Sequence, residues 1–95
     1  MRQKANANRA PKYAVQLARS ARKEIEALDP PVAERILKRI ESLIDEPRPS
    51  GVKKLEGSTD QWRIRIGDWR VVYRVDDKEK LVDISVVRHR REVYK

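Results

Sequence analysis

The sequence predicts an α+β fold of the order β-α-α-β-β-β. An antiparallel-rich, four-stranded sheet is expected to carry a two-helix hairpin on one face and to leave a basic open face on the other. Two patterns predict this fold. Apolar residues recur at helical spacing between residues 17 and 45, and from residue 61 onward they alternate with polar residues, as in strands. With 95 residues, the chain has the size of one two-layer domain.

The first strand is expected from Lys12 to Leu17, where Tyr13, Val15 and Leu17 share one face. Before it, residues 1–11 are polar, include three basic residues and show no periodicity, which is typical of a disordered basic tail. A basic arm that contacts nucleic acid is the alternative for this segment. Residues 12–95 are expected to form a single domain.

Two amphipathic helices follow and are expected to form a hairpin against the sheet. Ser20 is the candidate N-cap of the first helix. The apolar residues of this helix are Leu17, Ala21, Ile25 and Leu28. The second helix is expected to begin at Pro30, with Asp29 as its N-cap, and to run to about Asp45. Its apolar stripe consists of Val32, Ile36, Ile40, Leu43 and Ile44.

A loop is expected from Pro47 to Asp60, and then a β-hairpin with the sequence QWRIRIGDWRVVY at residues 61–73. The loop contains Lys53 and Lys54, which are either ordinary surface charges or nucleic-acid contacts. In the hairpin, Gly67 and Asp68 match a two-residue type II′ turn, which prefers glycine at its first position.

The strands of the hairpin are expected to separate apolar from basic side chains. Residues 62, 64 and 66 form an apolar face on the first strand, and residues 69, 71, 73 and 75 continue it on the second. The last strand is expected from Leu81 to Val87, with Val82, Ile84 and Val86 on the same core face.

Arg63, Arg65 and Arg70 are expected to lie close together on the open face. Like charges on neighbouring strands destabilise a sheet, so their clustering favours an anion that compensates for them. The planar guanidinium group suits a phosphodiester. The alternative is a solvated outer face, which is common in antiparallel sheets.

Composition narrows the classes of function. The formal net charge of +8 favours a polyanionic partner, either nucleic acid or an acidic protein. The absence of cysteine excludes thiolate catalysis, and a single histidine excludes a multi-histidine metal site within one chain. No apolar run reaches the roughly 18 residues of a membrane span, and no signal-peptide core follows the basic start. We therefore expect no membrane association and a cytoplasmic location.

The chain ends in a basic segment, RHRREVYK, at residues 88–95. If it folds back beside the arginine face, Tyr94 offers a ring on which an unstacked base can lie. His89 is either a packing residue or a proton-transfer group.

Three motifs together resemble the RelE/ParE superfamily of toxins from type II toxin–antitoxin modules, and most of all its RelE branch. They are Lys-Lys-Leu-Glu-Gly at residues 53–57, Arg-x-Arg-x-Gly-x-Trp-Arg-x-x-Tyr at residues 63–73, and His-Arg-Arg-x-x-Tyr at residues 89–94. The resemblance covers nearly the whole chain, from about residue 13 to residue 94.

The resemblance implies a ribosome-dependent endoribonuclease (an mRNA interferase) that inhibits translation. The RNA 2′-hydroxyl would attack the scissile phosphate without a metal or other cofactor. The catalytic residues that the resemblance implies are Arg63, Arg65, Arg70, Arg90 and Tyr94. Neighbouring basic residues are the candidate RNA contacts, namely Lys53, Lys54, Arg88, His89 and Arg91.

The best-known RelE-type enzymes have lysines where this chain has Arg63 and Arg65. Arginine does not release its proton in proteins, so neither residue is expected to act as the general base. Tyr94 or His89 is expected to fill that role.

The implied partners are the ribosome, mRNA and a cognate RelB-like antitoxin that is acidic and partly disordered when free. A ParE-like toxin that inhibits DNA gyrase by binding, without ribonuclease activity, is the alternative. A stand-alone basic RNA-binding module is a third possibility.

Overall fold

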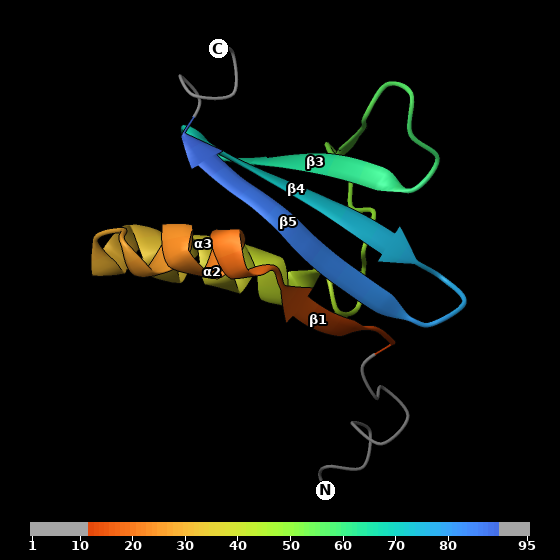
Figure 1. The fold of residues 1–95 in the computed structure, drawn as a ribbon, viewed down its shortest axis with the longest axis horizontal. Coiled ribbons are helices and arrows are strands. Elements are labelled where there is room, and N and C mark those ends of the chain that lie inside the picture. The colour runs from red at the N-terminus through yellow and green to blue at the C-terminus, as the bar shows by residue number, and fades with distance from the viewer. Residues whose placement is uncertain (1–11, 90–95) are drawn as a thin grey trace, which may run out of the picture.

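The computed structural model describes residues 12–89. In chain order, its elements are β1 (Ala14–Leu17), α2 (Arg19–Glu26), α3 (Pro30–Ser42), β2 (Lys53–Lys54), β3 (Gln61–Ile66), β4 (Trp69–Asp76) and β5 (Leu81–His89). The strands form one sheet in the order β1-β5-β4-β3-β2, in which β1 is parallel to β5 and the other neighbours are antiparallel. The helices lie side by side next to β1 and β5 (Figure 1). The predicted α+β class is confirmed.

The predicted basic tail, residues 1–11, lies outside the described residues, as do Arg90, Arg91 and Tyr94. No helix within residues 12–89 is long and apolar enough to span a membrane.

The prediction of four strands is wrong, because β2 adds a fifth. Lys53 pairs with Arg63 and Lys54 with Trp62, and the amide of Leu55 donates to the carbonyl of Gln61 at 3.0 Å. Two residues are too few to show the alternation that reveals a strand, so this segment resembles a loop in the sequence. The pairing brings Lys53 beside Arg63.

The helix boundaries differ from the prediction at two points. α2 begins at Arg19 with Ala18 as its N-cap, while Ser20 lies inside the helix and its hydroxyl donates to the carbonyl of Ser85 at 3.4 Å. Asp29 does occupy the N-cap position of α3, although its side chain makes no capping hydrogen bond. α3 ends at Ser42 rather than near residue 45, because the chain tightens there into i→i+3 backbone hydrogen bonds.

One apolar core fills the space between the helices and the sheet. Its buried residues are Ala21, Ile25, Ile36, Ile40, Leu43, Ile64, Ile66, Val71, Tyr73, Val75, Val82, Ile84 and Val87. The hairpin of β3 and β4, which supplies five of them, turns as predicted. Ile66 pairs with Trp69, and the φ of Gly67 is +61° whereas that of Asp68 is not positive, which matches a type II′ turn.

A β-bulge in β5 changes which residues face the core. Tyr73 pairs with Ile84 and Val72 pairs with Val86, so Ser85 is an extra residue, and its hydroxyl donates to the carbonyl of Val72 at 3.1 Å. Beyond the bulge the alternation shifts by one residue. Val87 is therefore fully buried, and Val86 lies on the opposite face. The prediction that Val86 faces the core is wrong, because it extended strict alternation through the bulge.

We expect Tyr73→Phe to lower the free energy of unfolding by about 1 kcal/mol at neutral pH. Tyr73 is fully buried, and its hydroxyl donates to the carbonyl of Pro47 at 2.7 Å. The substitution removes the donor and leaves this carbonyl without its bond. Chemical denaturation of both proteins measures the difference.

The unfolding free energies of the wild type and of Tyr73→Phe are expected to converge at alkaline pH. Burial raises the pKa of Tyr73 from 10.0 to about 12 in the folded protein. The stability that its neutral hydroxyl provides is therefore complete below pH 10 and is lost as the pH rises toward about 12. Phenylalanine does not titrate, so the gap between the two unfolding free energies should shrink in this window. A difference in unfolding free energy that stays constant over this pH range would contradict the raised pKa of Tyr73.

Candidate nucleic-acid interface

Basic side chains form a two-row grid on the open face of the sheet. In one row, Lys53 of β2 is the register partner of Arg63 of β3. In the next row, Arg65 of β3 pairs with Arg70 of β4, which in turn pairs with Arg88 of β5. Paired residues project from the same face of a sheet, so the side chains of all five basic residues leave the backbone on the side opposite the core. The expected proximity of the three hairpin arginines is present.

The grid surrounds a small hollow of about 200 Å³. Its lining residues are Gly51, Lys53, Arg63, Arg65 and Arg70. Gly51, with a φ of +92°, was not a candidate from the sequence, where Ser50-Gly51 resembles an ordinary turn. Four of the five lining residues are cations, so the hollow suits an anion.

Arg70 differs from the other cations of the hollow because it is only 4% exposed. Arg65 is exposed and Arg63 is partly buried. Burial restricts the rotamers of Arg70, so its planar set of donors is oriented before any ligand arrives. This is the property that electrostatic stabilisation of a transition state requires.

The basic character of the open face is confined to one part of it. Arg74 lies further along β4, on the same face as Arg70. Its guanidinium group lies between three carboxylates, at 3.8 Å from Asp60 and Asp76 and 3.7 Å from Asp83. Within residues 12–89, neither Arg63 nor Arg65 forms an ion pair. Among the described residues, no carboxylate therefore neutralises Arg63 or Arg65, whereas three carboxylates surround Arg74.

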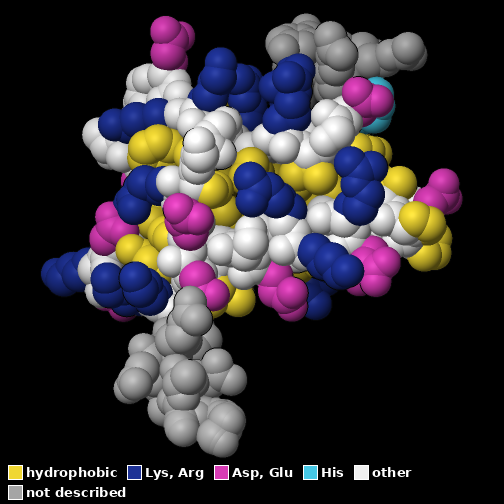
Figure 2. Space-filling view, turned by 180° about the vertical axis from the view of Figure 1, so that it is seen from behind, with side chains coloured by type: hydrophobic (Ala, Val, Ile, Leu, Met, Phe, Trp, Pro, Cys, Tyr) yellow, Lys and Arg dark blue, Asp and Glu magenta, His cyan; other side chains and the backbone are white. Residues whose placement is uncertain are grey.

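The surface view agrees with this uneven distribution of charge. On the face shown, Lys and Arg side chains lie over the upper and central parts and also at both ends of the lower edge, where Asp and Glu side chains lie among them (Figure 2).

Two candidate RNA contacts lie on the other face. Lys54 is the register partner of Trp62, and its Nζ atom is 6.0 Å from the centre of that ring. His89 is the register partner of Trp69, and the two rings meet edge to face with their centres 5.3 Å apart. Trp62 and Trp69 belong to the core face, so neither Lys54 nor His89 shares a face with the arginines. Their predicted RNA contacts stay predictions.

Arg88 starts in the same row as Arg70, but its guanidinium points elsewhere. Its Nη1 atom forms an ion pair with Oε2 of Glu24 in α2 at 2.9 Å. Glu24 was not a candidate from the sequence, because no local pattern links residues that are 64 positions apart.

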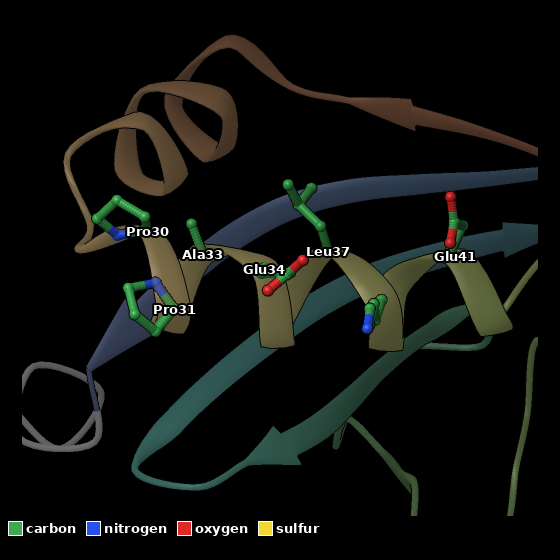
Figure 3. Close-up of a pocket in the computed structure, with 7 residues that line it drawn as sticks. Pro30, Pro31, Ala33, Glu34, Leu37 and Glu41 are labelled. Atoms are coloured by element: carbon green, nitrogen blue, oxygen red, sulfur yellow. The ribbon is translucent and has the colours of Figure 1, made fainter.

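A second and larger hollow lies along α3, away from the cations of the sheet. It has a volume of about 730 Å³ (Figure 3). Pro30, Pro31, Ala33, Glu34, Leu37, Lys38 and Glu41 line it. This set has one cation and two carboxylates, so the hollow does not resemble an anion site.

Similarity to known proteins identifies the family. A family model, described as the ParE toxin of the type II toxin-antitoxin system parDE, matches residues 15–94. The chain belongs to the RelE/ParE toxin superfamily. It is thus a toxin of the type II toxin–antitoxin class.

Relatives of this toxin family with RelE names resemble the chain over most of its length. A protein of Methanocaldococcus jannaschii named as toxin RelE1 is 30% identical in an 87-residue alignment, and the match covers 88% of this chain and 97% of that protein. A chain of the archaeal RelE–RelB complex from Pyrococcus horikoshii OT3 is 33% identical, with a TM-score of 0.75, and the match covers 83% of this chain and 96% of that one. The isolated E. coli RelE toxin is 30% identical, with a TM-score of 0.73 and coverage of 86% and 90%.

Proposed function

We propose that this toxin is a ribosome-dependent mRNA endoribonuclease of the RelE type. The observation that carries the proposal is the hollow lined by Lys53, Arg63, Arg65 and Arg70, because it offers a phosphodiester several cations with no carboxylate among its described lining residues. The likeness to RelE toxins at 30% identity or more supports the same activity.

In the proposed reaction, the 2′-hydroxyl of the RNA attacks the adjacent phosphorus. The bond from phosphorus to the 5′-oxygen breaks, and this oxygen takes a proton from water, which leaves a 2′,3′-cyclic phosphate and a 5′-hydroxyl end. Negative charge develops on the phosphoryl oxygens in the transition state, where guanidinium groups stabilise it. Arg70, oriented by burial, is the main group for this purpose, and Arg63 and Arg65 hold the phosphate.

The proton of the 2′-hydroxyl needs an acceptor other than arginine. His89 packs against Trp69 on the other face, which is a poor position for a base at the hollow. We therefore assign the base to Tyr94. Arg90 would stabilise the phosphorane or assist the leaving 5′-oxygen, and Arg91 would contact RNA.

A RelB-like antitoxin is the proposed partner. Several of the similar structures are complexes of RelE with RelB. An acidic antitoxin segment, partly disordered when free, would neutralise the cations of the hollow and so block RNA. The toxin would act in the cytoplasm, where it meets ribosomes and mRNA.

Expression in cells tests the proposed activity. Primer extension on a reporter mRNA should find cuts within codons, and the cuts should vanish in Tyr94→Phe. The name of the matching family model favours a second candidate, a ParE-like toxin that binds DNA gyrase. Growth arrest with intact mRNA and induction of the DNA-damage response would support that candidate and refute the nuclease.

A pair of adjacent lysines gives a matched test of the RNA-binding face. We expect Lys53→Ala to weaken binding of single-stranded RNA by about threefold to tenfold, because it removes one cation from the hollow. Lys54→Ala removes a cation from the opposite face, so its effect on the Kd should be smaller than that of Lys53→Ala. Fluorescence anisotropy at one fixed salt concentration measures both, and equal losses would argue against the hollow as the binding site.

A further inference from the structure

The backbone places Arg88 within reach of the basic grid. The bulge at Ser85 puts residue 88 on the open face, where it is the register partner of Arg70. Without the bulge, the alternation of β5 would place this residue on the core face. Arg65, Arg70 and Arg88 therefore start in one row across three strands. Among the described residues, however, Arg88 is not one of those that line the hollow.

The side chain of Arg88 turns over the edge of β5 toward α2. β1 pairs with β5 only as far as Ile84. Beyond this residue α2 lies next to β5, as the hydrogen bond from the hydroxyl of Ser20 to the carbonyl of Ser85 indicates. Nη1 of Arg88 lies 2.9 Å from Oε2 of Glu24 and 3.3 Å from the carbonyl oxygen of Val87. The contact thus draws the guanidinium away from Arg70.

We propose that Glu24 is a built-in counter-ion that holds Arg88 out of the phosphate site and competes with RNA for it. The proposal rests on the proposed function, since it concerns RNA at the same face. The side chains of Arg88 and Glu24 are 40% and 31% exposed, and ion pairs so open to water are weak enough to exchange. Three neighbouring guanidinium groups also repel one another, and Glu24 relieves this repulsion while no phosphate is bound.

The inference predicts a specific coupling between residues 24 and 88. Glu24→Gln in the full chain should tighten the binding of a short, fluorescein-labelled single-stranded RNA by about twofold to fivefold, the range for a half-exposed ion pair. In an Arg88→Gln background, the same substitution should produce no such gain. Glu26→Gln removes an equal charge from the exposed end of the same helix and reports the general effect of net charge.

Two results would overturn the inference. One is a gain in Glu24→Gln no larger than that in Glu26→Gln, and the other is a gain that persists in the Arg88→Gln background. If Glu24 only tied α2 to β5, Glu24→Gln would lower the Tm and leave RNA binding at the Glu26→Gln level. A wild-type protein that binds RNA but shows no coupling would refute this inference alone, whereas a wild type that neither binds nor cuts RNA would refute the proposed function.

Discussion

Replacing Arg70 with alanine is expected to lower the rate of mRNA cleavage by about 10²- to 10³-fold, the usual loss when one oriented donor to a developing oxyanion is removed. Arg70 is the buried cation of the hollow, and Arg65 is its cross-strand neighbour. Cleavage by the purified toxin on programmed ribosomes, followed by primer extension at several times, measures the rate. The cleavage rate of Arg70→Lys should lie between those of the wild type and Arg70→Ala, because lysine keeps the charge but lacks the planar donors.

Arg74→Ala is the matched control, since Arg74 belongs to the same strand and the same face. Three carboxylates already neutralise it, so its removal should leave the cleavage rate near that of the wild type. Because Arg70 is buried, the Tm of each variant must be compared as well. A folded Arg70→Ala protein that cuts mRNA at the wild-type rate would exclude a role for Arg70 in catalysis.

Replacing Val87 with aspartate is expected to unfold the protein. Val87 is fully buried opposite Val71, and an unpaired carboxylate there costs several kcal/mol. Total stabilities of about 5–15 kcal/mol are usual for native proteins, so little would remain. Loss of the cooperative thermal transition by circular dichroism would show the effect.

Val86→Asp tests the position of the bulge against the prediction made from alternation. Val86 lies on the open face next to Val72, so the carboxylate can reach water, and the cost should be about 1 kcal/mol or less. The same charge should weaken RNA binding, because it joins the row of Arg63. If Val86→Asp unfolds and Val87→Asp does not, the alternation continues through Ser85 and the bulge is wrong.

Much of the fold follows from local patterns in the sequence. The apolar positions of α2, α3 and β3 have the spacing of their elements, and the Gly67–Asp68 turn has the residues that its geometry needs. β2 is too short to leave a pattern, and its pairing depends on the chain returning beside β3. The bulge at Ser85 also escapes prediction, because a single inserted residue between Ile84 and Val86 leaves a plausible alternation on either side.

Some residues of the candidate site can likewise be predicted from the sequence, whereas others cannot. Arg63, Arg65 and Arg70 are brought together by one hairpin, so a short segment of sequence is enough to predict their cluster. Lys53 and Lys54 are equivalent in the sequence, and only the register with β3 sends one to the hollow and the other to Trp62. The pairing of Glu24 with Arg88 depends on where α2 packs along β5, which no local pattern encodes.

The central claim is that this toxin cuts mRNA through the basic hollow of its sheet. Its most direct test is to add the purified toxin to ribosomes programmed with a defined mRNA and to analyse the RNA ends. We predict cuts that leave a 2′,3′-cyclic phosphate and a 5′-hydroxyl, and we predict their loss in Arg70→Ala but not in Arg74→Ala. Intact mRNA, together with inhibition of supercoiling by purified DNA gyrase, would contradict the claim.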